Sequence, residues 1–363
     1  MKKTILWLII IISTLSLTLI GVGCKEEAAP AEEVTEKVTE EVTEEEAAPV
    51  EEEAKDKYNI GVSWQGVTND WASSELYHLK YGFEVKYADK LKNVYMFGCD
   101  MDDKKQIADI EDLISKDIDL LLIDPVSETS LATVIEKAKD SGIPVVIFGA
   151  SAGTNKYDSY INRDNVKSGY QYADWMGKRL NGKGNVIVIM GFPGSGYSND
   201  VLKGVDDGLK NYPDIKVLGT EYAMYTPATS KQIVESYLTK GDKIDGVIVD
   251  GGLMDFGVLE AFSDAKLPLP PTTGDDYTGF LRKVKELNYT DFVSISGGSE
   301  LALDAVDIAF KLLAGEQVTR DNLIAPKYYE GKDIIGMINE DMPDSFWLEC
   351  KIPKEDLSKY YTK

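Results

Sequence analysis

DLLLIDP, at residues 119–125, is the stretch that decides the fold. Its four consecutive apolar residues form a short unbroken run, which predicts a strand buried on both faces, and the final proline ends this strand. Amphipathic stretches at 104–116 and 129–141 predict a helix on each side of it, and PVVIF at 144–148 predicts the next strand. Strands and helices that alternate in this way indicate an α/β fold with a parallel sheet.

The alternation extends toward the N-terminus and restarts toward the C-terminus. YNIGVSW at 58–64 is a predicted strand, and 71–90 is a predicted helix. A strand at 157–161 is expected to cross to a second set of helices and strands, which runs over 166–295 and is followed by a long helix at 299–314. The sequence therefore predicts two doubly wound, Rossmann-like lobes. Ligand would bind where the carboxyl ends of their strands face each other across a cleft.

Composition and rare residues exclude several classes of protein. The chain has 363 residues, which suits about two domains. Its formal net charge of −23 argues against nucleic-acid binding, which needs clustered Lys and Arg. His78 is the only histidine and lies inside a predicted helix, so we expect a packing residue and no enzyme. Cys99 and Cys350 lack metal-ligand spacing, and we expect two buried free thiols that could pair only if the fold brings them together. No metal and no cofactor are expected.

Residues 1–24 have the pattern of an export signal. Two lysines precede an apolar run at 5–20, and this run closes on the residues GVGC at 21–24. The ending resembles a bacterial lipoprotein cleavage site, which implies that Cys24 carries a lipid and tethers the mature protein to a membrane outside the cytoplasm. A plain transmembrane anchor is the alternative, although the run is slightly short to span a bilayer.

Residues 25–57 are dominated by Glu, Ala, Pro, Val and Thr, and they contain no aromatic residue. They hold 14 acidic and 4 basic residues, a net charge of −10. Such a segment cannot bury a core, and repulsion between like charges keeps it extended. We expect an acidic, disordered tether that lets the folded part of the chain reach its partner.

Aromatic side chains gather at the predicted strand ends. They are Trp64, Trp71, Phe148, Tyr197, Tyr225 and Tyr277. Flat rings can cover the C–H faces of a sugar while Asp and Asn side chains bond its hydroxyls, so the group favours a sugar site, with core packing as the alternative for any single ring. GFPGSG at 191–196 lies between a strand and a helix. We expect a ligand-facing turn or a helix entry there, because a phosphate loop would need another glycine order and a lysine.

With this order of segments, residues 58 to about 325 resemble the periplasmic sugar-binding proteins of the ribose and galactose type. The segments that carry the resemblance are YNIGV at 58–62 leading to TNDW at 68–71, LLLIDP at 120–125, SGIPVV at 141–146, INRDN at 161–165, 191–204, YPD at 212–214, 246–257 and GDD at 274–276. The resemblance implies a type I periplasmic binding protein fold with a three-segment hinge. It also implies the role of the solute-binding protein of an ABC transporter, with the permease subunits as partners. The stretch 347–361 is similar to the tails of rhamnose-binding and autoinducer-2-binding relatives.

Matching these segments residue by residue implies a set of ligand contacts. They are Asn69, Trp71, Asn199, Tyr225 and Asp275. The Asp-Arg pair that grips sugar hydroxyls in the family falls on Gly149-Ala150 here, and the family's cleft asparagine falls near Asp250-Gly251. Ribose is therefore not favoured, and a hexose, a polyol or a less polar ligand is expected. Its further contacts are expected to be Trp64, Phe148, Tyr197 and Asp250.

The resemblance also implies how the chain is divided between the lobes. The N-terminal lobe is expected to comprise 58–162 and 298–319, and the C-terminal lobe 163–297 and 320–363. The crossings are expected near 162–164, 296–298 and 318–320. The expected hinge residues are Asp164, Gly297 and Gly298. Glycines suit a hinge because they absorb large backbone rotations.

The expected function is capture of a small sugar or polyol by an exported, lipid-anchored monomer. Ligand binding would close the two lobes, and no bond would be made or broken. Two other roles stay open at this point: a nucleoside-binding lipoprotein of the same fold, and a receptor subunit that reports its ligand to a sensor without transport. An exported enzyme ranks below both, because the sequence shows no set of catalytic residues.

Overall fold

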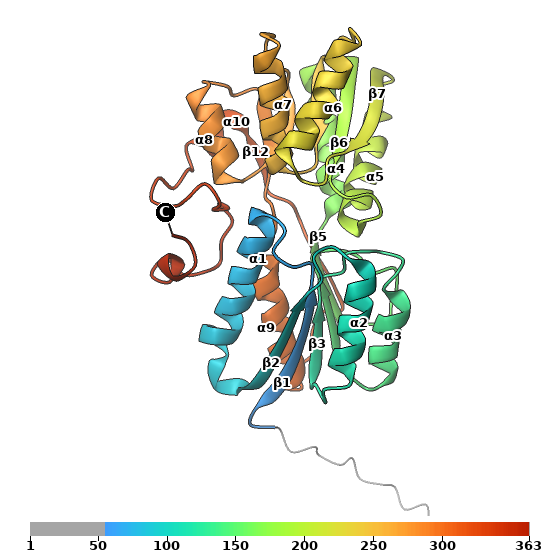
Figure 1. Ribbon diagram of the computed structural model, residues 1–363, viewed down its shortest axis with the longest axis vertical. Coiled ribbons are helices and arrows are strands. Elements are labelled where there is room, and N and C mark those ends of the chain that lie inside the picture. Colours follow the sequence, from blue (N-terminus) through green and yellow to red (C-terminus); the bar gives the residue numbers. More distant parts are fainter. Residues whose placement is uncertain (1–54, 363) are drawn as a thin grey trace, which may run out of the picture. The chain divides into compact units, whose positions relative to one another are not determined.

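A computed structural model of the chain describes residues 55–362, so the export signal with Cys24 and most of the acidic tether lie outside the described residues. Two six-stranded sheets, each covered by helices, form two lobes (Figure 1). Within these residues the strand pairs are parallel, apart from one antiparallel pair at an edge of the second sheet. This confirms the predicted α/β architecture.

The first sheet contains the strand that the sequence singled out. Its strands are β1 (Tyr58–Trp64), β2 (Leu91–Gly98), β3 (Leu120–Ile123), β4 (Val145–Phe148), β5 (Ser159–Arg163) and β11 (Asp321–Ile324), in the order β11-β5-β4-β3-β1-β2. All four residues of β3 are buried, because helices cover both faces of the sheet.

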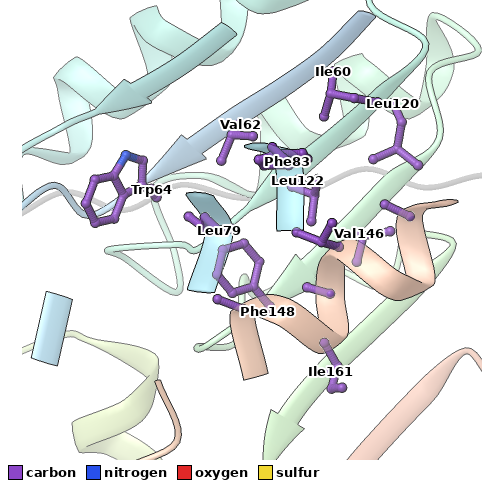
Figure 2. Packing of buried hydrophobic residues seen from close by; sticks show 14 of the residues in the cluster. Ile60, Val62, Trp64, Leu79, Phe83, Leu120, Leu122, Val146, Phe148 and Ile161 are labelled. Atoms are coloured by element: carbon purple, nitrogen blue, oxygen red, sulfur yellow. The ribbon is translucent and has the colours of Figure 1, made fainter. Parts of the chain in front are cut away.

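Two pairs of helices cover the first sheet. They are α1 (Asp70–Tyr81) with α9 (Leu301–Leu313) on one face, and α2 (Asp103–Ile114) with α3 (Ala132–Asp140) on the other. Alternate residues of a strand point to the same face, so Ile60, Val62 and Trp64 share one core with α1 and α9 (Figure 2). The predicted helix at 71–90 is interrupted. It ends as α1, and a π-helical turn, η1 (Gly82–Lys86), and a 3-10 turn, η2 (Ala88–Lys90), follow.

The second sheet repeats this plan. Its strands are β6 (Lys183–Met190), β7 (Asp214–Tyr222), β8 (Gly246–Val249), β9 (Thr272–Asp275), β10 (Phe292–Ile295) and β12 (Tyr328–Glu330), in the order β12-β10-β9-β8-β6-β7. Its helices are α4 (Asn165–Arg179) and α5 (Gly196–Leu209) on one face, α6 (Pro227–Thr239) and α7 (Gly252–Asp264) on the other, and α8 (Thr278–Glu286) and α10 (Gly331–Ile335) beside β10. β12 pairs antiparallel with β10.

The third crossing between the lobes lies later in the chain than predicted. β11 pairs in parallel with β5 from Asp321 to Ile324, so the chain leaves the first sheet only after Ile324 and crosses over 325–327. The predicted crossing at 318–320 was wrong. β11 is an edge strand whose sequence, DNLI, is largely exposed, and it therefore lacks the apolar run by which the other strands were found.

The C-terminal tail, which we define as residues 344–361, joins both lobes. Its backbone bonds to α8 of the second lobe, where Thr278 donates to the carbonyl of Phe346 at 2.9 Å. Its end packs on the first lobe, where Tyr361 lies in a buried cluster with Tyr77 of α1. The assignment of 320–363 to the second lobe was therefore wrong for the end of the tail. The contacts join residues up to 287 positions apart, and no local sequence pattern reveals them.

The two cysteines of the described residues differ in burial. Cys99 and Cys350 are free thiols, as predicted, but Cys350 is only half-buried. Among the helices within 55–362, none is long and apolar enough to cross a membrane.

Candidate functional site

A pocket lies between the lobes, at the carboxyl ends of the strands of both sheets. Residues that follow β1, β3 and β4 line it from the first lobe, and residues that follow β6, β7 and β8 line it from the second. The cavity volume is about 100 Å³, several times the ~10–15 Å³ that one water molecule needs. The pocket therefore has room for a small molecule.

The structure brings six of the nine predicted contact residues to this pocket. They are Asn69, Trp71, Tyr197, Tyr225, Asp250 and Asp275. Of the three predicted hinge residues, Gly297 and Gly298 also line the pocket. Asp164 does not, and its Oδ1 accepts the backbone N–H of Lys167 at 2.9 Å and so caps α4.

Three predicted contacts lie elsewhere. Trp64 and Phe148 are buried in the core of the first lobe, so their prediction as pocket residues was wrong (Figure 2). They alternate in register with apolar residues of their own strands, and that register turns both rings toward α1 and α9. Asn199 is also absent from the pocket wall. Its Nδ2 donates to Oε2 of Glu128 at 3.1 Å, a hydrogen bond between the second lobe and the first.

Asp124, which follows β3, is a pocket carboxyl that the sequence did not single out. Gln65 Nε2 donates to Oδ2 of Asp124 and to Oε2 of Glu75, each at 3.1 Å. Burial raises the pKa of Asp124 to about 7, and burial with the nearby Asp124 charge raises the pKa of Glu75 well above its usual range. A Cβ on Gly149 would lie 2.5 Å from Oδ1 of Asp124. The space where the resemblance placed a family aspartate is thus filled by a carboxyl from the neighbouring strand.

Asp250, which follows β8, lines the pocket, and hydrogen bonds from the second lobe hold its carboxyl group. Its Oδ2 accepts the backbone N–H of Gly191 at 3.0 Å and the hydroxyl of Ser198 at 3.1 Å. Its backbone carbonyl accepts the hydroxyl of Tyr197 at 2.7 Å. Oδ1 is buried and has no partner among residues 55–362, and burial raises the pKa of this carboxyl to about 7. A hydroxyl group in the pocket could satisfy Oδ1.

Tyr225 enters the pocket on a strained turn after β7. It and Met224 both have φ of 52°, a conformation that bulky residues rarely adopt. A Cβ on Gly191 would overlap the Tyr225 ring, and a Cβ on Gly251 would lie 3.2 Å from its Cε1. The first glycine of GFPGSG therefore makes room for the aromatic ring of Tyr225 in the pocket wall.

Two tryptophan side chains lie against Gly297, at the second crossing. Trp71 donates from Nε1 to the Gly297 carbonyl at 2.7 Å. Trp347, from the C-terminal tail, is 2 % exposed and lines the pocket, and a Cβ on Gly297 would overlap its ring. Its buried Nε1 has no partner within the described chain. Trp347 was not among the predicted contacts, because it follows no predicted strand.

The segment INRDN at 161–165, which ends β5 and begins α4, supplies donors to the pocket. Arg163 and Asn165 both line it and are at least nine-tenths buried. The Nδ2 group of Asn165 has no hydrogen-bond partner among the described residues. Of this segment only Asp164 was singled out from the sequence.

The two lobes are bonded to each other beside the pocket. Tyr277, at the start of α8, donates from its hydroxyl to Oδ2 of Asp70 in α1 at 2.6 Å. Burial raises the pKa of Tyr277, so this hydroxyl keeps its proton. Together with the Asn199 bond to Glu128, this contact holds the lobes together across the cleft.

The pocket is equipped to bind a ligand that has both polar groups and apolar faces. It offers carboxyls, amides and a guanidinium to hydroxyl groups, and aromatic rings to apolar faces. His78 is fully buried and lies outside the pocket wall. Within the part of the chain that the structure describes, no group of His, Cys, Asp or Glu side chains could hold a metal ion.

Two α/β lobes with a polar and aromatic pocket between them define a ligand-binding protein. The family described as periplasmic binding protein domain matches residues 60–317, more than half of the chain, and the chain belongs to this family. The relatives named below are binding proteins and not enzymes, and the family works outside the cytoplasm.

Known relatives share about two thirds of their length with this chain. It is 30% identical over 219 residues to the xylitol-binding protein of Mycolicibacterium smegmatis, a match that covers 60% of this chain and 62% of that protein. It is 28% identical over 221 residues to the ribose import binding protein of Bacillus subtilis, covering 60% and 70%. It is 28% identical over 220 residues to the galactofuranose-binding protein of Escherichia coli, covering 57% and 66%.

Solved structures show the same fold. An ABC transporter solute-binding protein from Thermobispora bispora has a TM-score of 0.73 and 25% identity, with 80% of this chain and 90% of that chain covered. A galactofuranose-binding protein has a TM-score of 0.70 and 23% identity, with 77% and 98% covered. A Mycobacterium smegmatis protein in complex with β-D-fucofuranose has a TM-score of 0.70 and 20% identity, with 77% and 94% covered. The type I periplasmic binding protein fold implied by the resemblance is confirmed.

Proposed function

We propose that this protein is the substrate-binding lipoprotein of an ABC importer and captures a monosaccharide or sugar alcohol between its lobes. The observation that carries the proposal is the pocket wall, where buried carboxyl and amide atoms without partners lie beside aromatic rings. Oδ1 of Asp250 accepts from a hydroxyl, Nδ2 of Asn165 donates to one, and the rings of Trp71 and Tyr225 cover the C–H face. The named relatives bind xylitol, ribose and galactofuranose, which supports the same class of ligand.

Delivery depends on closure of the lobes. Ligand bridges the two walls of the pocket and so stabilises the closed arrangement, which the permease subunits recognise. Gly298 has a φ of 86° and lies at a crossing, so the backbone there can rotate at little cost. We propose Gly298 as a hinge residue on this ground, together with its neighbour Gly297 and with Asp164 at the first crossing.

The membrane anchor is a separate part of the proposal. Its support is the sequence alone, where an apolar run ends in GVGC at 21–24. Lipid on Cys24 and the acidic segment after it keep a monomeric binding domain near its permease. The protein with Cys24→Ala is expected in the soluble extracytoplasmic fraction, and wild type in the membrane fraction. Equal partition of the two would contradict the anchor.

Thermal shift with purified protein tests the ligand class. Ribose, xylitol, arabinose, galactose, myo-inositol and nucleosides are each added in excess. A ligand present at 100 times its Kd stabilises the folded state by about 2.7 kcal/mol, which is readily measured. A shift with one neutral sugar or polyol supports the proposal. A shift with nucleosides alone replaces it with the nucleoside-binding role, and no shift with any sugar or polyol overturns it.

A further inference from the structure

Arg163 is the only arginine of the described chain that has no carboxylate at ion-pair distance. The other three, Arg179, Arg282 and Arg320, each pair with an aspartate on the surface. Arg163 is 6% exposed and is one of the residues that line the pocket. A buried charge without a direct partner is costly, so this position calls for a function.

The backbone is arranged to make room for this guanidinium. A Cβ on Gly298 would overlap Nη2 of Arg163, so a glycine at the second crossing is what lets the side chain reach the pocket. Arg163 itself stands at the end of β5, at the first crossing. The guanidinium is thus fixed where two of the segments that join the lobes pass each other.

The carboxyls near Arg163 act on it only at longer range. Its charge opposes the rise in pKa that burial causes at Glu300 and Asp276. Both Oδ atoms of Asp276 are already taken, by the backbone N–H groups of Gly297 and Glu349. Asp276 therefore balances the charge of Arg163 without consuming its hydrogen-bond donors.

The charges of the pocket wall limit what these donors can meet. Asp124, Asp250 and Asp275 line the same pocket, so three carboxyl groups stand against one guanidinium. An anionic ligand would pair with the arginine but be repelled by this wall. Hydroxyl and ring oxygens of an uncharged ligand can accept from the guanidinium while the ligand's hydroxyls donate to the carboxyls.

We propose that Arg163 is the principal donor of the binding site, that it fixes an uncharged polyhydroxylated ligand through hydroxyl or ring oxygens, and that the pocket rejects the corresponding sugar acids. This inference rests on the proposed function and adds to it the residue that positions the ligand and the charge that the ligand carries. Arg163 lies at a lobe crossing. Ligand bound to it therefore also links occupancy of the pocket to the arrangement of the lobes.

The test compares Arg163→Gln, Arg163→Lys and the control Arg179→Gln in full-length protein with the signal removed. The probe is the neutral sugar or polyol that stabilises wild type most, titrated by calorimetry. Loss of charged hydrogen bonds predicts that Arg163→Gln weakens binding about ten- to a hundredfold. Arg163→Lys keeps the charge but lacks the planar fork, so it recovers part of the affinity. The control, which loses an exposed ion pair, keeps wild-type affinity.

A purely structural role for Arg163 gives a different result. It predicts that Arg163→Gln lowers the melting temperature without ligand, whereas a ligand-binding role leaves this temperature within about 2 °C of wild type and removes only the shift that the ligand causes. Wild type that binds a neutral sugar while Arg163→Gln binds it within threefold overturns the inference and leaves the proposed function standing.

Galactose and galacturonate, which differ in one carboxylate, test the charge of the ligand. Weaker binding of galacturonate supports the inference, and tighter binding overturns it. Wild type that binds no neutral sugar or polyol removes the proposed function and the inference with it.

Discussion

At the scale of the residue, the pocket's chemistry follows from how its carboxyl groups are buried. Asp250 has a pKa near 7 in the folded protein and near 4 when exposed, because burial disfavours its charge. Its folded pKa is raised, so the stability that it contributes is fully present below about pH 4 and is lost as the pH rises toward 7. Ionisation of Asp250 near neutral pH therefore costs stability. A hydrogen bond from a ligand hydroxyl to the carboxylate can reduce this cost.

Asp250→Asn is expected to remove that loss of stability. The amide can keep the acceptor for Gly191 and Ser198 but never ionises. We expect the free energy of unfolding of the variant, relative to that of wild type, to increase by about 2–4 kcal/mol as the pH rises from about 4 to about 8. Unfolding in urea at each pH measures this difference. The exposed Asp89→Asn is the control and should show no such gain. A pH-independent difference between Asp250→Asn and wild type would contradict the raised pKa.

The residues that the sequence placed correctly and incorrectly differ in a simple physical way. Tyr225 and Asp250 lie in turns beyond their strands, and Tyr197 lies in the first turn of the helix that follows its strand, and such residues line the pocket. Trp64 and Phe148 are the last residues inside their strands, where alternation fixes the face, and both turn into the core. Counting from Ile60 and Val62 to Trp64 would have revealed this. Positions such as that of Arg163 depend on how two distant segments cross, and no local pattern contains that information.

At the scale of the element, the turn after β4 shapes the first-lobe wall. Gly149 and Gly142 flank this strand with similar φ values of 76° and 82°. A Cβ on Gly149 would meet Asp124, whereas a Cβ on Gly142 would meet nothing within 4 Å. The two glycines therefore form a matched pair that separates the cost of backbone conformation from the cost of moving the carboxyl.

Substituting alanine at both positions tests this arrangement. Gly142→Ala should cost about 1–2 kcal/mol of unfolding free energy, from the left-handed backbone alone. Gly149→Ala should cost about 1–3 kcal/mol more, because it displaces Asp124 from its bond to Gln65, and it should weaken ligand binding. Chemical denaturation and ligand titration measure the two effects. Equal losses at the two sites would show that Gly149 serves only the turn.

The architecture could be predicted from the sequence at this scale, except where an element lacks an apolar run. β3 and β4 were found because a short apolar run bounded by turn residues indicates a buried strand. β11 was missed because edge strands are largely exposed and short. Because β11 belongs to the first sheet, missing it also misplaced the predicted boundary between the lobes.

At the scale of the whole molecule, hydrogen bonds between the lobes set how readily the pocket stays closed. Tyr277 donates to Asp70 across the cleft at 2.6 Å, and Tyr212 donates to Asp174 inside the second lobe at 2.7 Å. Tyr277→Phe should weaken ligand binding about fivefold, because the closed arrangement loses about 1 kcal/mol. Tyr212→Phe removes a similar bond but should leave affinity unchanged. Calorimetric titration compares them, and equal affinity of both variants would refute a role for the cross-lobe bond.

The C-terminal tail is a fourth connection between the lobes, beside the three crossings. The backbone N–H of Glu349 donates to Asp276 in the second lobe at 2.8 Å, and that of Lys351 donates to Nε2 of His78 in the first at 3.2 Å. Two residues span about 7 Å at most, so the lobes cannot separate far at this edge while both bonds hold. The hydroxyls of Tyr361 and Ser74, 2.7 Å apart, fasten the end of the tail.

Because His78 is the only histidine of the chain, its ring reports directly on whether the tail is docked. Burial under the tail lowers its pKa to about 4, so the stability that depends on the neutral ring is lost as the pH falls from 6.5 toward 4. In protein without a histidine tag, the single ring signal in proton NMR should titrate near pH 4. Tyr361→Ala, which removes a buried ring of the tail, should move this midpoint toward 6.5, whereas the more exposed Tyr328→Ala should leave it in place. A wild-type midpoint near 6.5 would mean that the tail does not stay on the first lobe in solution, and the lobes would then be joined by the three crossings alone.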